Sequence, residues 1–274
     1  MTVHDKFQMG GAAPLRGLGF RRRGSTALPL VAVILFLAIG APAQTTNALS
    51  DAEIQGRRLA QQLLEQQPAT NFVQNGVLTI RASKGKRSEI PVQIQTLVQG
   101  PVWQVDYETT GPSNRVRLIV LHEPDRPNGY YLWTGLEGGG IETDRKAATL
   151  SGKEIMKPFA GSDFWVADLG LEFFHWPEQK VLKKEIKRSR GCTVLESINP
   201  NPPTNGYSRV VSWIDGETLG IVQAEAYDAG GKLLKEFEPK SFKKVNGQWE
   251  LQEMEIRNVQ TGSRTRLEFD LPKE

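Results

Sequence analysis

The stretch that decides the fold runs Trp213-Ile-Asp-Gly-Glu-Thr-Leu219 and continues through Asp228-Ala-Gly-Gly-Lys-Leu-Leu-Lys235 to Phe237. It predicts a strand over 207–215, a turn at 216–220 and a second strand over 221–227, with a third strand from 233. This antiparallel ladder carries no set of catalytic residues. The pattern therefore favours a β-rich binding protein that works through the surface or the cavity of its sheet.

Strand patterns continue on both sides of this ladder. Residues 135–160 are less regular and predict a loop. A sheet this large rarely stays flat and open, so we expect it to curl. The fold class predicted is mainly β (α+β), a curved antiparallel sheet or incomplete β-barrel of about eleven strands. The further strands are predicted over 76–82, 90–95, 103–107, 115–122, 130–133, 181–188, 192–197, 233–244, 249–258 and 265–271.

Two helical segments interrupt the strand pattern. Ser50 and Glu53 have the spacing of a capping box, and the apolar residues after them predict an amphipathic helix that ends near Pro68. Ser162 or Asp163 can cap a second, short helix that runs to about Phe174. We therefore expect two or three helices to cover the sheet.

Residues 1–43 have the features of a secretory signal peptide. Three arginines at 21–23 precede an apolar run at 27–39, and Ala41-Pro-Ala43 has the form of a cleavage site. The apolar run is shorter than the roughly 20 residues that cross a membrane. We expect cleavage after Ala43, a single domain over 44–274, and a location in the periplasm. The alternative is an uncleaved segment that anchors the protein in the inner membrane.

Removal of this segment changes the charge of the chain. Residues 1–43 hold five basic residues and one acidic residue, so the net charge of +3 for the whole chain becomes −1 for residues 44–274. Such a balance gives no case for nucleic-acid binding. Cys192 is the single cysteine, which excludes an intramolecular disulfide, and a small half-buried strand residue is its expected role. We expect a monomer.

The sequence offers no set of residues for catalysis, a metal or a cofactor. His122 and His175 lie far apart and lack metal-ligand spacing, so packing roles are expected for both. The glycines at 138–140 lack the lysine and the helix that phosphate binding requires. Asp163 is explained as a helix cap and Asp168 as a residue with local hydrogen bonds. We therefore do not expect an enzyme.

Several short motifs resemble those of the LolA-like outer-membrane lipoprotein-sorting proteins. They are Gly161-Ser-Asp-Phe164 with Asp168, Trp213-Ile-Asp215, and Tyr227-Asp228 with Gly231-Lys232 and Lys235. The resemblance covers residues 50–274. It implies an incomplete β-barrel of about eleven strands whose open side is covered by helices. It also implies a hydrophobic cavity that receives the acyl chains of a lipoprotein or a lipid, without a cofactor, for transport across the envelope.

Candidate binding residues follow from this expectation. For the cavity, they are Trp103, Val105, Tyr107, Phe164, Trp165 and Trp213. For contact with lipid headgroups or a receptor protein, they are Lys183, Lys184, Lys187 and Arg188, although lysines on an exposed edge strand also prevent edge-to-edge pairing. The alternative function is an envelope sensor or regulatory module of the same fold, which detects lipid and contacts a partner protein.

Overall fold

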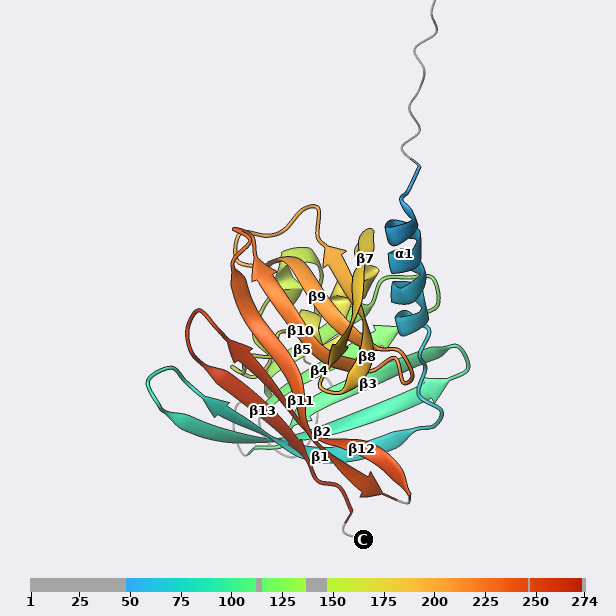
Figure 1. Ribbon diagram of the computed structural model, residues 1–274. Coiled ribbons are helices and arrows are strands. Elements are labelled where there is room, and N and C mark those ends of the chain that lie inside the picture. The colour runs from blue at the N-terminus through green and yellow to red at the C-terminus, as the bar shows by residue number, and fades with distance from the viewer. Residues whose placement is uncertain (1–47, 112–114, 137–146, 246, 273–274) are drawn as a thin grey trace, which may run out of the picture. The chain divides into compact units, whose positions relative to one another are not determined.

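The computed structural model describes residues 48–111, 115–136, 147–245 and 247–272, which all fall in one compact unit. The predicted signal segment and the glycines at 138–140 lie outside the described residues. Thirteen strands form one sheet (Figure 1). Their bounds are β1 Phe72–Arg81, β2 Arg87–Gln99, β3 Val102–Thr109, β4 Arg115–His122, β5 Gly129–Leu136, β6 Ala148–Leu150, β7 Glu178–Lys187, β8 Arg190–Ile198, β9 Tyr207–Asp215, β10 Ile221–Asp228, β11 Leu233–Val245, β12 Gln248–Asn258 and β13 Arg264–Phe269.

Every pairing in the sheet is antiparallel, and the strand order is β6-β5-β4-β3-β2-β1-β13-β12-β11-β10-β9-β8-β7. Strands β6 and β7 are the two edges, so the sheet is open. The predicted fold class is confirmed, with thirteen strands where about eleven were expected. Strand β6 lies inside the segment that was predicted as a loop.

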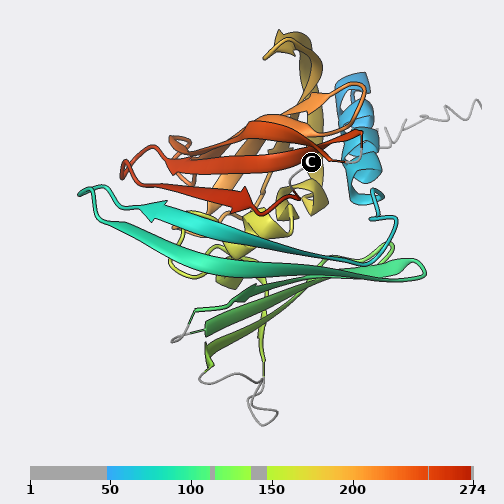
Figure 2. The same cartoon turned by 90° about the horizontal axis from the view of Figure 1, so that it is seen from below.

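The helical elements lie on the inner side of the curled sheet or at its edge. Figure 2 shows the two halves of the sheet facing each other with the short mid-chain helices between them. The mid-chain elements are the 3₁₀ helices η1 (Gly152–Ile155) and η2 (Glu172–His175) and the α-helix α2 (Val166–Leu169). Val166 and Ala167 pack with Leu118, while Phe173 and Phe174 pack with Leu195, so the segment fills the core against both halves.

Helix α1 (Asp51–Leu64) begins at the predicted capping box. The Ser50 side chain accepts from the Glu53 backbone N–H at 3.3 Å, and the Glu53 carboxylate accepts from the Ser50 backbone N–H at 2.7 Å. The helix packs on edge strand β7 at Gly56, where a Cβ atom would come within 2.4 Å of the Lys180 backbone nitrogen. Glycine is therefore what allows the helix to approach the edge of the sheet this closely.

The mid-chain helix differs from its prediction. The residue at its N-cap is Trp165, and the Asp168 carboxylate accepts from the Trp165 backbone N–H at 2.8 Å. Neither Ser162 nor Asp163 is the cap. Leu171 adopts a left-handed conformation with φ of 49°, which ends the helical geometry after one turn and starts η2. The cap was assigned wrongly because a helix of one turn offers almost no periodic pattern from which to find its start.

Candidate functional site

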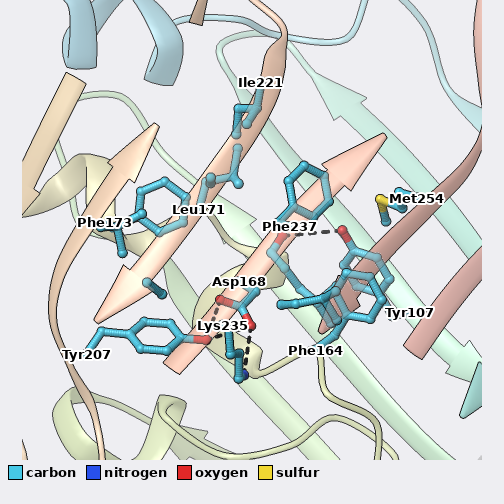
Figure 3. Close-up of a pocket in the computed structure, with 15 residues that line it drawn as sticks. Tyr107, Phe164, Asp168, Leu171, Phe173, Tyr207, Ile221, Lys235, Phe237 and Met254 are labelled. Carbon is cyan, nitrogen blue, oxygen red and sulfur yellow. Dashed lines mark hydrogen bonds and ion pairs between the residues drawn. The ribbon is translucent and has the colours of Figure 1, made fainter. Parts of the chain in front are cut away.

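A partly open cavity of about 220 Å³ lies between strands β9–β12 and the mid-chain segment, with one residue from β3 in its wall. Its walls are mostly apolar side chains (Figure 3). Concave, mostly apolar spaces with a few polar groups are the usual sites for small molecules in proteins. The main apolar side chains are Tyr107, Phe164, Leu171, Phe173, Ile221, Phe237 and Met254.

Strand β10 makes room for this cavity with two small residues. Ala224 and Ala226 both line the cavity and lie two positions apart on one face of the strand. Both are buried. A larger side chain at either position would occupy part of the space, so the identity of these residues sets the size of the cavity.

A wider groove of about 860 Å³ adjoins the cavity. Leu171, Ile221 and Phe237 line both spaces, so these three side chains form the partition between them. The groove continues past Leu63 of α1 to the exposed side chains of Phe242 and Trp249 on the β11–β12 hairpin. The groove therefore extends from this partition to the surface.

Two arginines stand at the rim of this groove. Arg188 donates to the Pro239 carbonyl oxygen at 2.7 Å and forms an ion pair with Glu238. Arg190 is held by the carboxylate of Asp215, which raises the pKa of the guanidinium further above its ordinary value. The rim of the groove therefore carries two cations, each paired with an acid.

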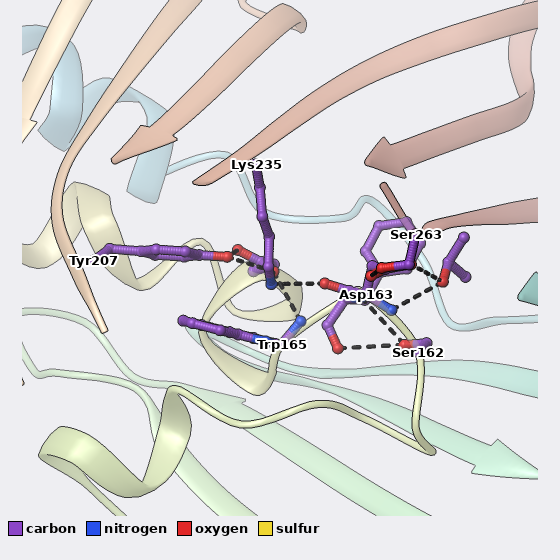
Figure 4. A network of polar contacts seen from close by, with 9 residues as sticks. Ser162, Asp163, Trp165, Tyr207, Lys235 and Ser263 are labelled. Carbon is purple, nitrogen blue, oxygen red and sulfur yellow. Dashed lines mark hydrogen bonds and ion pairs between the residues drawn. The ribbon is translucent and has the colours of Figure 1, made fainter. Parts of the chain in front are cut away.

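Lys235 on β11 is the centre of the polar part of the cavity wall. Its side chain is buried, and Nζ donates to the Asp163 carbonyl oxygen at 2.6 Å and to Asp168 Oδ2 at 3.3 Å (Figure 4). The ammonium lies 3.7 Å from the centre of the Trp165 ring. The Tyr207 hydroxyl donates to Asp168 Oδ1 at 2.9 Å. These contacts join strands β9 and β11 to the start of α2.

Burial governs protonation in this network. It lowers the pKa of Lys235 from its ordinary value to about 8, against the opposing effects of Asp168 and Asp163. It also raises the pKa of Tyr207 well above its ordinary value, and the charge of Asp168 adds to that rise. Both side chains therefore remain proton donors to Asp168 at neutral pH. The network holds these elements together, because Lys235 and Tyr207 both donate hydrogen bonds to Asp168.

Asp163 ties the same segment to strand β13. Its carboxylate accepts from Ser263 Oγ at 2.5 Å and from Thr265 Oγ1 at 2.9 Å, and its backbone N–H donates to Thr265 Oγ1 at 2.8 Å. The mid-chain segment is thus held from β9, β11 and β13 together. Its position, and with it one wall of the cavity, is fixed by polar contacts as well as by packing.

The structure brings two of the six predicted cavity residues into the wall, Tyr107 and Phe164. The Tyr107 hydroxyl donates to the Leu169 carbonyl oxygen at 3.3 Å, which links β3 to α2. Val105 packs against the core beside them without lining the cavity. Trp165 does not line the cavity: its ring stacks on Tyr207 with ring centres 4.6 Å apart and so packs against the polar network.

The other two predicted cavity residues lie elsewhere. Trp103 stacks on His122 of β4 with ring centres 3.7 Å apart. Trp213 belongs to a separate cluster with Cys192 and Val194, and its Nε1 donates to Glu185 on β7 at 2.5 Å. Neither tryptophan lines the cavity or the groove. Alternation along β9 puts Trp213 on the face opposite the buried Ile214, which the sequence pattern left undecided.

The predicted headgroup residues lie on edge strand β7 and in the turn after it. Lys183 pairs with Glu185 at 2.8 Å, Lys184 is exposed, and Lys187 lies 4.6 Å from the centre of the Trp213 ring. Arg188 is the one member that also borders the groove. These residues therefore surround the outer edge of the sheet and reach the site only at the turn.

Three functional candidates were missed as a group: Asp168, Tyr207 and Lys235. Lys235 carried a usable signal, because it alternates with Leu233 and Phe237 on a strand whose inner face should be apolar. Asp168 and Lys235 were noted as motif residues, but nothing in the sequence showed that they meet.

Within the described residues, no cluster of three or more histidine, cysteine, aspartate or glutamate side chains is placed to hold a metal ion. Across the same part of the chain, no helix is both long and apolar enough to pass through a membrane. The polar groups at the cavity are one lysine, one aspartate and two tyrosines, which suit hydrogen bonding and ion pairing.

Comparison with known proteins identifies the fold. Residues 143–273 match the model of a family described as an uncharacterised protein. No curated protein matches the sequence. Three solved structures share the architecture at low sequence identity, and they confirm the predicted LolA-like fold.

The first is a domain from Vibrio parahaemolyticus whose name assigns it to outer membrane lipoprotein sorting. It has a TM-score of 0.63 and 20% identity, and the match covers 80% of this chain and 92% of that one. The second is a DUF1329 family protein from Desulfovibrio piger, with a TM-score of 0.63, 18% identity and coverage of 82% and 96%. A LolA superfamily protein from Nitrosomonas europaea follows, with a TM-score of 0.50, 16% identity and coverage of 78% and 94%.

Proposed function

We propose that this protein binds the acyl chains of a lipoprotein or a lipid and shields them from water in the bacterial envelope. The observation that carries the proposal is the apolar cavity behind Phe237 together with the groove that leads from it to the surface. The protein would be exported by the segment 1–43 and would act in the periplasm. Its fold is shared with a domain named for lipoprotein sorting.

The driving force is burial of hydrocarbon. Each methylene moved from water into an apolar site contributes about 0.8 kcal/mol. A chain that enters the groove past Trp249 and reaches Phe237 passes a lining that is mostly apolar, with Arg188 and Arg190 among its polar residues. Rotation of Leu171, Ile221 or Phe237 would join the groove to the inner cavity, because these side chains form the partition. Binding needs no covalent step.

A fluorescent fatty-acyl probe tests this function directly. Titration should show saturable binding, and Ala224→Phe should weaken it at least tenfold, because the new ring occupies the cavity. Ala148→Phe, on the exposed edge strand β6, is the matched control and should bind as the unchanged protein does. Mass spectrometry of lipids extracted from protein purified from the periplasm provides the natural ligand. The proposal is wrong if the purified protein is reproducibly free of lipid and also does not bind the probe.

A second measurement separates a carrier from a sensor. A carrier loaded with the probe should release it to acceptor vesicles or to an acceptor protein, with transfer that speeds up as acceptor is added. A sensor should instead retain the probe and gain affinity for a partner protein domain, which pull-down with and without lipid would detect. We favour the carrier, because three side chains, those of Leu171, Ile221 and Phe237, separate the cavity from a groove that opens at the surface.

A further inference from the structure

Four arginines stand side by side across four neighbouring strands, far along the sheet from the groove. The pairing register sets Arg87 opposite Arg81, Arg81 opposite Arg264, and Arg264 opposite Arg257. Residues directly opposite in an antiparallel pair project from the same face. The four guanidinium groups therefore form one row across β2, β1, β13 and β12.

The two central arginines of this row form no ion pair with any residue that the structure describes. Arg87 pairs with Glu89 at 2.5 Å, and Arg257 pairs with Glu236 at 2.8 Å. Within the described residues, by contrast, Arg81 and Arg264 form neither an ion pair nor a side-chain hydrogen bond. Like charges directly opposite each other destabilise a sheet. The two guanidinium groups therefore have hydrogen-bond donors available to an anion from outside the protein, although Arg264 lies close enough to Glu255 for their charges to interact.

The turns beside the row strengthen the positive charge. The β1–β2 and β12–β13 turns project next to each other in both views (Figures 1 and 2). The segments 81–87 and 257–264 contain six lysines and arginines and no aspartate or glutamate. Two surface hollows, of about 390 and 200 Å³, are each lined by both Arg81 and Arg264. The smaller hollow also contains Glu253 and Glu268, but its four arginines outnumber these two acids, so positive charge predominates at this end of the sheet.

We propose that this arginine row docks the protein on a lipid bilayer surface that carries anionic phosphate headgroups. Guanidinium groups match phosphate oxygens with paired hydrogen bonds. An acidic protein is the less fitting partner, because protein interfaces are built around large apolar anchors. In the two segments, Val259 is the one large apolar residue.

Docking through this row leaves the groove free. Strand β12 begins beside Trp249, which lines the groove, and ends next to Arg257 in the row. Its eleven residues span about 35 Å at roughly 3.3 Å per residue. The row and the groove therefore lie at opposite ends of the strand, so that a docked molecule can still exchange its ligand with the solution or with a partner. The proposal does not depend on what the cavity binds.

Co-sedimentation with vesicles tests the docking. The protein should bind vesicles of phosphatidylglycerol and phosphatidylcholine and not vesicles of phosphatidylcholine alone, and salt should weaken the binding. Each near-surface charge changes such binding about fivefold, so Arg81→Gln/Arg264→Gln should bind about 25-fold more weakly. Arg57→Gln/Arg58→Gln removes two exposed arginines from α1 and should leave binding unchanged. Equal binding by both variants, or none by the unchanged protein, overturns the proposal.

Further arms identify the source of the anion. Binding of inorganic phosphate is measured by calorimetric titration, and binding of poly-glutamate is measured beside it. If either probe binds in a way that depends on Arg81 and Arg264 while anionic vesicles fail to bind, the row binds a free anion or an acidic protein. That result would overturn docking on a bilayer. Thermal unfolding of the double variant shows whether weaker vesicle binding results from a folding defect. Loss of two opposed charges should raise the unfolding midpoint of Arg81→Gln/Arg264→Gln, so weaker vesicle binding by a more stable protein supports the proposal.

Discussion

Removal of the Asp168 carboxylate should be far more damaging than removal of the lysine that pairs with it. Asp168 accepts from three donors: Lys235 Nζ at 3.3 Å, the Tyr207 hydroxyl at 2.9 Å and the Trp165 backbone N–H at 2.8 Å. Asp168→Ala would leave all three without this acceptor. Breaking a buried ion pair from one side costs about 3–5 kcal/mol. We expect a loss in that range for the free energy of unfolding.

Lys235→Met should cost less, about 1–2 kcal/mol, because Asp168 keeps two of its donors. Methionine also replaces most of the apolar stem of the buried Lys235 side chain. The double variant Asp168→Ala/Lys235→Met should be more stable than the sum of the two losses predicts, with a coupling of about 1–3 kcal/mol. Urea unfolding followed by circular dichroism measures all three losses.

The pH dependence gives this experiment a second readout. Because burial lowers the pKa of Lys235 to about 8, the folded state binds fewer protons than the unfolded state between about pH 8 and the ordinary lysine pKa. Stability due to this residue therefore rises with pH above about 8. The difference in unfolding free energy between the unchanged protein and Lys235→Met should increase from pH 8 to pH 10.

Glu236→Ala supplies the matched control. It breaks the ion pair with Arg257, which is 2.8 Å long but solvent-exposed, and such pairs contribute at most about 1 kcal/mol. The reasoning is refuted if Lys235→Met costs as much as Asp168→Ala, or if the two changes are additive. Either result would mean that the network does not hold the mid-chain segment in place.

Two further predictions concern other parts of the fold. Burial and the neighbouring His175 lower the pKa of His122 to about 4, so the free energy of unfolding should fall as the pH drops from 6.5 to 4. His122→Phe keeps the ring stack on Trp103 and should make that decline smaller, as measured by acid unfolding curves. Gly56→Ala should destabilise the protein by about 1–3 kcal/mol in urea, despite the better helix propensity of alanine, because its Cβ would meet the Lys180 backbone. Unchanged stability would show that α1 can shift away from β7.

Local patterns were enough to predict most of the fold. The capping box at Ser50 and the hairpin at 216–220 depend on contacts between residues close in sequence, and both are present. Strand β6 was missed because three residues are too few to show alternation. Pairing of β1 with β13 joins the two ends of the described chain, and no local pattern contains that information.

The site was only partly predictable, for a related reason. Tyr107 and Phe164 line the cavity, and both are large apolar residues on elements expected to face inward. Asp168 and Lys235 lie 67 residues apart, and their contact exists only once β11 has paired with its neighbours. Trp213 was placed in the cavity although it lies outside, since alternation on a strand fixes two faces without saying which one is inner.

The cavity itself explains why the polar network is needed. An apolar space of about 220 Å³ that the protein's own side chains leave unfilled lacks the packing contacts of a close-packed core, which is unfavourable for the folded state. Collapse of the apolar walls onto Ala224 and Ala226 would therefore lower the free energy of the folded state. Contacts of Asp168 with Lys235 and Tyr207 oppose that collapse, because they fix the start of α2 relative to β9 and β11. Ala224→Phe should consequently raise the unfolding free energy while it weakens binding of an acyl probe at least tenfold. A variant that lost both stability and binding would show that the space cannot accept the ring, and would contradict a cavity kept open by the network.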